Sequence, residues 1–241
     1  FATYASCQLR QNRLALAATY QYTSFVSAPF PPDKLLALSA QTTTMNRVNG
    51  VYEGEIGVTM QFIPDNTDII YDSLPQPYTS GNTGLLIDEN QINIDQVIGS
   101  ANYDIGHVFD QNTSTSGLAS LGGVCDAQYK ASAVTGSKRP VGDPFDIDYV
   151  AHEMGHQFNA NHTQNNSCNR NDPTAVEPGS GSTIMAYAGI CAPNVQAHSD
   201  AYFNGINLEE IGPFIDSSST GGSCGMVISN TPAAPVLDPS P

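Results

Sequence analysis

The stretch YVAHEMGHQFNANHTQ, residues 149–164, constrains the fold and the chemistry of this chain more than any other. The 241 residues include five histidines, and three of these, His152, His156 and His162, fall within eleven consecutive positions. Neutral imidazole is a common protein ligand for metal ions. The clustering therefore indicates a metal site, and its spacing makes specific demands on the backbone that carries it.

The segment VGDPFDIDYV, which precedes the histidines, predicts the start of a helix. Asp143 can cap this helix, Pro144 occupies its first position, and two further acidic residues suit the positive end of the helix dipole. A helix that continues through Phe158 places His152 and His156 one turn apart on the same face. Both imidazoles can then bind one zinc ion through bonds of about 2.0–2.1 Å.

The third histidine requires the chain to turn back. In a continued helix, His162 would lie about 9 Å along the axis from His156, because each residue rises about 1.5 Å. The helix must therefore end after Phe158. Asn159 lies midway, and asparagine is the non-glycine residue that most readily adopts a positive φ. Three neutral imidazoles leave the fourth zinc position open for water, as a catalytic site requires.

Glu153 directly follows the first histidine and is rotated by about 100° around the helix axis. It cannot easily join the same set of ligands. Its carboxylate can instead lean toward a water on the metal and act as a general base. A bare HExxH pair arises by chance, but the third histidine and the turn-competent asparagine make this pattern specific for one catalytic zinc ion.

These residues resemble the metzincin zinc peptidases, whose pattern is H-E-x-x-H-x-x-G-x-x-H followed by a methionine turn. Asn159 stands where the family has Gly. The segment SGSTIMAYAGIC places Met185 after a Gly/Ser loop, and in metzincins such a methionine forms an apolar floor beneath the imidazoles. An ordinary core methionine is the alternative. Met185-Ala186-Tyr187 resembles astacins and serralysins, in which the tyrosine can approach zinc and stabilise the oxyanion. For Tyr187 a hydrogen-bonded core tyrosine is an equally weighted alternative.

Within the metzincins, residues 117–134, GLASLGGVCDAQYKASAV, resemble the segment that reprolysin (adamalysin) peptidases carry before their active-site helix. The resemblance covers about residues 10–224. It implies an α/β zincin fold, with a twisted, mostly parallel five-stranded sheet, long helices and a smaller irregular C-terminal lobe. It also implies a substrate that lies antiparallel to the edge strand near 103–121. Thr163 stands where reprolysins have Asp, and Ala15 stands near their calcium-binding Glu, so calcium is possible but no site is assigned.

The five cysteines form no CxxC pair and are odd in number. Reduced buried thiols are one interpretation. Two disulfides with one remaining thiol fit better, which implies an oxidising compartment. The reprolysin resemblance implies that Cys125 pairs with Cys224 and Cys168 with Cys191, which leaves Cys7.

The composition limits the classes of partner that the protein can bind. The net charge of −15 arises from 23 acidic and 8 basic residues, and it repels nucleic acid and anionic lipid. No apolar run approaches the roughly 20 residues that span a bilayer. We expect a monomer that acts on protein or peptide substrates, without membrane insertion. The chain begins at Phe1 without a leader, so we expect a processed form of a secreted zymogen.

The hydrophobic pattern predicts strands that alternate with helices, as in an α/β layer fold. The expected strands are 13–20, 57–64, 67–72, 103–110 and 129–136, and the expected helices are 33–53, 84–99 and 207–215. We expect one catalytic domain, 1–228, with an upper lobe of about 1–160 and a lower lobe of about 161–228. Residues 229–241 predict a proline-rich linker or tail, with room for a further domain after it.

The pattern as a whole predicts a secreted zinc endopeptidase. Zinc on the three histidines would lower the pKa of a bound water, and Glu153 would take the proton of that water and pass it to the leaving amine. A non-catalytic, zinc-containing adhesion or binding module is the alternative, and a zinc hydrolase of another amide is a weaker third. His107 is expected in a strand, where it could line the cleft, and His198 is expected to be structural.

Overall fold

The computed structural model describes residues 9–112, 116–216 and 220–228. One six-stranded sheet organises this part of the chain, with the order β2-β1-β3-β5-β4 and with β6 paired to β1. Four strands run parallel, whereas β4 is antiparallel to β5 and β6 is antiparallel to β1. The strands are β1 (Leu9–Ala18), β2 (Val58–Phe62), β3 (Ile105–Gln111), β4 (Ser116–Ala119), β5 (Ala133–Ser137) and β6 (Met226–Ile228). The predicted α/β class and mostly parallel sheet are confirmed.

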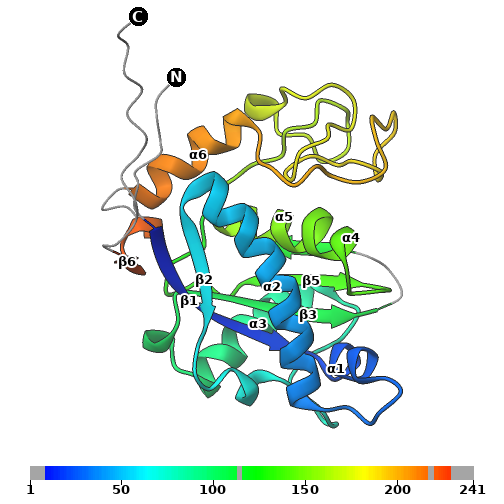
Figure 1. Ribbon diagram of the computed structural model, residues 1–241, viewed down its shortest axis with the longest axis vertical. Helices are drawn as coiled ribbons and strands as arrows, with labels where there is room; N and C mark the ends of the chain where they lie inside the picture. Colours follow the sequence, from blue (N-terminus) through cyan, green and yellow to red (C-terminus); the bar gives the residue numbers. More distant parts are fainter. Residues whose placement is uncertain (1–8, 113–115, 217–219, 229–241) are drawn as a thin grey trace, which may run out of the picture.

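Helices cover both faces of the sheet (Figure 1). The α-helices are α1 (Tyr20–Ser27), α2 (Lys34–Ile56), α3 (Thr83–Val97), α4 (Asp143–Phe145), α5 (His152–Gln157) and α6 (Gly205–Asp216). A π-helix, η3 (Asp146–Ala151), joins α4 to α5, and short 3₁₀ turns are η1 (Asn66–Ile69), η2 (Ser100–Asn102), η4 (Asp172–Thr174) and η5 (Thr220–Gly222). Each of the three long predicted helices is present, with ends that shift by one to three residues.

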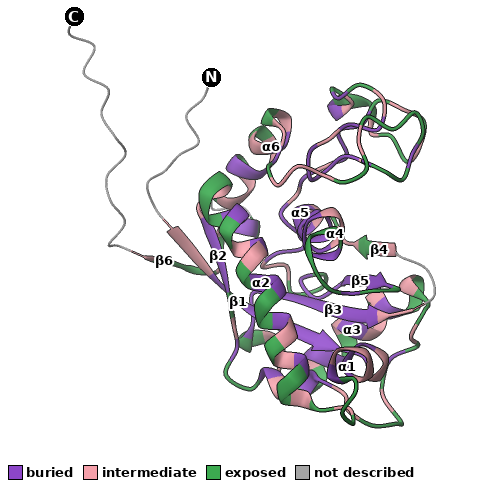
Figure 2. Cartoon of the chain, turned by 45° about the vertical axis from the view of Figure 1, so that its right-hand side comes forward, coloured by how far each residue is buried: buried purple, intermediate pink, exposed green. Residues whose placement is uncertain are grey.

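The central strand β1 shows why the sheet is buried on both sides. Leu14 and Leu16 point into the larger apolar core, which α2, η3 and α5 also line, whereas Ala15 and Ala17 point into a second core beneath α3. All four side chains are fully buried. A strand that is covered on both faces has a continuous run of apolar residues, as is typical of parallel strands. Figure 2 shows β1 as mostly buried within the sheet.

One sequence-based assignment is wrong, and another holds for only part of its range. The strand predicted at 67–72 is instead the 3₁₀ turn η1, followed by a single bridge from Ile70 to Ala18. The reason is Asn66, whose buried amide binds both the N–H and the C=O of Leu16 and so replaces a strand ladder. The edge strand expected near 103–121 is only β4, because β3 lies inside the sheet between β1 and β5.

The helical segment that carries His152 and His156, formed by α4, η3 and α5 and called the active-site helix below, also starts differently from the prediction. Gly142, with a positive φ of 78°, is the N-terminal cap residue, and Asp143 already belongs to the helix. The Asp143 carboxylate binds Arg47 on α2 at 2.9 Å, so its charge serves an ion pair rather than a cap. The π-helix that follows was not predicted; such insertions are frequent at functional sites.

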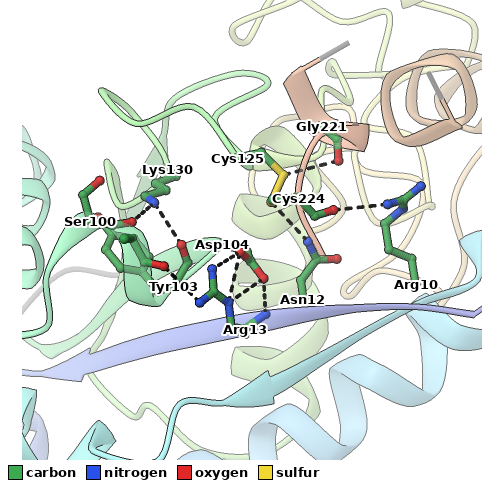
Figure 3. A network of polar contacts seen from close by, with 11 residues as sticks. Arg10, Asn12, Arg13, Ser100, Tyr103, Asp104, Cys125, Lys130, Gly221 and Cys224 are labelled. Atoms are coloured by element: carbon green, nitrogen blue, oxygen red, sulfur yellow. Dashed lines mark hydrogen bonds and ion pairs between the residues drawn. A yellow bond between two sulfur atoms is a disulfide. The ribbon is translucent and has the colours of Figure 1, made fainter. Parts of the chain in front are cut away.

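Both implied disulfides are present, Cys125–Cys224 and Cys168–Cys191. The first joins the segment after β4 to the chain just before β6, beside a network in which Asp104 binds the Arg13 guanidinium at 2.7 Å (Figure 3). Cys7 and the predicted tail at 229–241 lie outside the described residues.

Candidate metal centre

The active-site helix ends in a left-handed turn at Asn159, which has φ = 74°. The Asn159 N–H donates to the His156 carbonyl and the Ala160 N–H to the Gly155 carbonyl, each at 2.9 Å. This pair of bonds is the Schellman arrangement, in which the left-handed position is usually Gly. Asparagine tolerates this φ, so the chain reverses and brings His162 back toward the helix.

The structure brings the side chains of His152, His156 and His162 together, with their ligand atoms within 4.8 Å of one another. The Nε2 atom of His162 lies 3.2 Å from Nε2 of His152 and 3.0 Å from Nε2 of His156. The three rings come from two helical positions and from the loop beyond the turn. They form the only group of three or more potential metal-binding side chains in the described ranges.

Backbone carbonyls fix the tautomer of each ring. Nδ1 of His152 lies 2.7 Å from the Ile184 carbonyl, and Nδ1 of His156 lies 2.7 Å from the Ala160 carbonyl. Nδ1 of His162 lies 2.9 Å from the Asn169 carbonyl. A carbonyl only accepts hydrogen bonds, so every Nδ1 carries the proton and every neutral ring turns an Nε2 lone pair inward.

This arrangement suits a zinc ion. Three inward lone pairs cannot hydrogen-bond to one another, so only a cation can satisfy all three. Tetrahedral bonds of about 2.0–2.1 Å place neighbouring nitrogens about 3.3–3.4 Å apart, close to the observed 3.0 and 3.2 Å. Burial, and for the two helix histidines also the neighbouring rings, lower the pKa of all three, which keeps them in the neutral form that binds metal.

Glu153 is buried, and its side chain packs directly against the backbone of the edge strand. A Cβ atom on Gly117 of β4 would overlap the Glu153 carboxyl group. Desolvation raises the pKa of Glu153 to about 8, and a cation held by the histidines would oppose that shift. Gly117 was not singled out from the sequence, because only the tertiary packing shows what faces it.

Met185 lies under the histidines. It is fully buried, and a Cβ atom on Gly155 would overlap its Sδ atom. Gly155 belongs to the helical turn between His152 and His156, so Met185 packs against the backbone that carries both rings. The carbonyl of the preceding residue, Ile184, is the acceptor of the His152 Nδ1 proton.

Tyr187 stands at the edge of the same group. It is half-buried, and its ring centroid lies 4.7 Å from that of His162. Asn169 donates to the Tyr187 hydroxyl at 3.1 Å, while the Asn169 carbonyl accepts from His162. Asn169 itself has φ = 49°, and nothing in its sequence context identified it.

A buried carboxylate joins the segment after His162 to the methionine segment. Glu177 accepts from the Thr163 hydroxyl at 2.6 Å and from the Ser182 N–H at 2.7 Å. It also binds both the N–H and the hydroxyl of Thr183. Thr163, which replaces the Asp of reprolysins, therefore takes part in a complete hydrogen-bond network.

The two remaining histidines lie apart from the group. His107 is a fully buried strand residue that binds Gln157 and Thr135, so the suggestion that it lines the cleft is wrong. His198 is largely exposed and pairs with Asp148 on the active-site helix at 2.7 Å. This contact agrees with the predicted structural role of His198.

A pocket of about 360 Å³ opens over this group. Its wall combines the edge strand with the active-site helix and the loop beyond it, and includes Gly117, Glu153, His156, His162 and Tyr187. Glu153 is its only carboxylate among the described residues. The arrangement therefore places one potential proton acceptor beside a potential metal ion, within reach of an extended chain on the strand edge.

Comparison with known protein families also indicates a metallopeptidase. The family described as "Metallo-peptidase family M12B Reprolysin-like" matches residues 10–212. No curated protein gives a significant match.

Two solved structures match this chain in part. One, "Crystal Structure of metalloproteinase-II from Bacteroides fragilis", is 15% identical with a TM-score of 0.49, over 86% of this chain and 54% of that chain. The other, "Structure of a chaperone-substrate complex", is 13% identical with a TM-score of 0.48, over 86% of this chain and 35% of that chain. The chain thus spans about half and about a third of the lengths of these two proteins.

Proposed function

Because this chain belongs to the M12B reprolysin-like metallopeptidases, whose cofactor is zinc, we propose that it is a secreted zinc endopeptidase that cleaves peptide bonds in proteins. The observation that carries the proposal is the convergence of three Nε2 lone pairs beside the Glu153 carboxylate in an open pocket. The catalytic domain is residues 1–228, with the cleft between an upper lobe of about 1–160 and a lower lobe of about 161–228.

His152, His156 and His162 would hold the zinc ion through Nε2. When bound, zinc acts as a Lewis acid that polarises the scissile carbonyl and makes the attacking water more acidic. Glu153 accepts one proton from that water at a carboxylate oxygen and then delivers it to the nitrogen of the leaving amine. The apolar packing of Met185 beneath the rings holds them in place, and the left-handed turn at Asn159 returns His162 to them.

Tyr187 is proposed to bind the oxyanion of the reacting carbonyl. Its ring lies against His162, its side chain is only half-buried, and it lines the pocket rather than the core. The hydroxyl accepts from Asn169, so its own proton is free to be donated to a developing negative charge.

Secretion is supported by the two disulfides, which form and persist in oxidising compartments. No helix in the described ranges is both long and apolar enough to span a bilayer. We propose that the enzyme acts as a monomer on protein or peptide substrates.

The competing function is a binding module that keeps zinc for structure alone. The buried Glu153 argues against it, because burying a carboxylate that has no hydrogen-bond partner among the described residues costs free energy, and a structural site has no use for that group. The test compares the wild type with Glu153→Gln in digestion of casein or gelatin, with zinc content measured in both.

We expect the wild type to digest the substrate, to lose activity with a zinc chelator and to regain it with added zinc. Glu153→Gln should bind zinc equally well and show almost no cleavage. Glu209→Gln, which changes an exposed glutamate of α6 outside the pocket, is the matched control and should remain active. A folded, zinc-loaded wild type that cleaves nothing would support the binding module instead.

A further inference from the structure

Most of the basic side chains of this acidic protein bind an acceptor group on the protein itself. Six of the eight have a carboxylate or carbonyl partner, whereas Lys138 and Arg139 have neither an ion pair nor a side-chain hydrogen bond within the described residues. Both are exposed. The six paired residues are Arg10, Arg13, Lys34, Arg47, Lys130 and Arg170.

The two unpaired cations line a second pocket, of about 590 Å³. This pocket lies between the end of β5, the first turns of the active-site helix and the loop that follows Tyr187. Phe145, Tyr149 and Ile190 supply apolar wall. The pocket therefore combines an apolar interior with positive charge on one side.

The second pocket adjoins the metal centre. Tyr149 lines it and belongs to the π-helix η3, which leads directly into His152. Ala188 also lines it and directly follows Tyr187, which lines the catalytic pocket. A peptide that leaves the catalytic pocket along this face reaches the second pocket next.

The direction of the peptide follows from the antiparallel pairing with the edge strand that the reprolysin resemblance implies, combined with the strand order of the sheet. A substrate antiparallel to β4 runs in the same direction as β5, because β4 and β5 are antiparallel, with Ser116 opposite Gly136. Its C-terminal side then points toward the end of β5, where Lys138 and Arg139 follow Ser137. The residues after the cleaved bond, on the leaving-amine side, are the ones that meet the two cations.

Other charges around the two pockets do not cancel this asymmetry. Asp148 lines the second pocket, and its carboxylate accepts from His198 Nδ1 and from the Ser199 N–H. Its single negative charge is outweighed by the two positive charges of Lys138 and Arg139 in the same wall. Arg170, the basic residue of the catalytic pocket, is paired with Asp172 at 3.1 Å. In the described walls of the two pockets, unpaired positive charge therefore lies only on the leaving-amine side.

We propose that Lys138 and Arg139 are specificity determinants that select an acidic side chain, Asp or Glu, within the first few residues after the cleaved bond. The inference rests on the proposed peptidase function and names its substrate class. A protein with a net charge of −15 would otherwise repel acidic peptides, and two local cations reverse that repulsion at this position.

The test is cleavage of a peptide library followed by mass spectrometry, for the wild type and for the double variant Lys138→Gln/Arg139→Gln. We expect Asp and Glu to be enriched after the cleaved bond for the wild type only. On a matched pair of peptides that differ by one Glu-to-Gln exchange, the double variant should lose about fivefold in kcat/KM for the acidic peptide, mostly through KM. The neutral peptide should change by less than about twofold, and added salt should reduce the wild-type preference.

Two controls separate charge from structure. Lys138→Arg/Arg139→Lys keeps both charges and should keep the preference. Lys34→Gln removes one positive charge at the start of α2, away from both pockets, and should leave the preference unchanged. Cleavage of neutral and acidic peptides at equal rates by the wild type overturns this inference alone, whereas no cleavage of any peptide overturns the peptidase function with it.

Discussion

The packing of Gly117 against Glu153 gives a sharp prediction for Gly117→Ala. The added Cβ would overlap three atoms of the Glu153 side chain, whereas ordinary contacts lie at 3.4–4 Å. The Glu153 carboxylate must therefore move by about 1 Å, and a displacement of this size can lower a rate by about 100-fold. Overpacking at such a site costs about 1–3 kcal/mol of stability, which need not unfold the protein.

The assay is steady-state cleavage of a fluorogenic peptide, together with zinc content and thermal unfolding. Because Glu153 is proposed to act on the reacting atoms, kcat and kcat/KM should fall together by about 100-fold, with KM little changed. Zinc content should stay at one ion per chain, since Gly117 does not contact the histidines' Nδ1 acceptors.

Gly54→Ala is the matched control, because a Cβ at this exposed position of α2 meets nothing within 4 Å. It should leave the kinetics unchanged. An active Gly117→Ala enzyme with wild-type kcat would refute the argument that the edge strand positions the base. Loss of zinc in parallel with activity would show that the substitution acts through the metal centre instead.

Three further predictions follow from the same contacts. Gly155→Ala would force Met185 away from the helix, so we expect weaker zinc binding by competition with a chelator and a loss of about 1–3 kcal/mol in urea unfolding. Asn159→Val should destabilise the protein by about 1–3 kcal/mol, because its φ of 74° is unfavourable for a β-branched residue, whereas Asn159→Gly should keep the turn and the zinc. Burial lowers the pKa of His107 in the folded protein to about 4, whereas in the unfolded chain it is about 6.5. As the pH falls below about 6.5, the unfolded chain therefore binds a proton at His107 that the folded protein does not yet bind. Stability at pH 4.5 should therefore be about 2.5 kcal/mol lower than at pH 7 from this residue, and His107→Gln should remove that part of the pH dependence.

The sequence identified what depends on local spacing. Two histidines four residues apart on a helix, with a residue that tolerates positive φ before the third, are local facts, and the turn at Asn159 has the φ they require. The continuous apolar run of β1 and the long helix α2 are also set by the local sequence pattern.

What the sequence did not identify depends on long-range contacts. The side chain of Asn66 replaces strand pairing by binding Leu16, fifty residues away, so a strand-like run became a 3₁₀ turn. Gly117 was passed over because the group that fills the space beside it is Glu153, on a distant helix. Asn169 lies in a stretch without regular structure, and its carbonyl matters only because His162 turns toward it.

The acceptors of the three Nδ1 protons also bear on the chemistry. All three are neutral carbonyls, whereas a carboxylate in this position would add negative charge and make the imidazole a stronger donor to the metal. Neutral acceptors leave the positive charge of a bound zinc ion less compensated, and hence leave the ion a stronger Lewis acid. In the described wall of the pocket, the only negative charge that can then respond to the metal is Glu153, the group that must take the proton. The carbonyl acceptors thus fix the orientation of the three rings without adding negative charge. The main electrostatic partner that the described pocket wall offers a bound metal ion is then Glu153, the proposed general base.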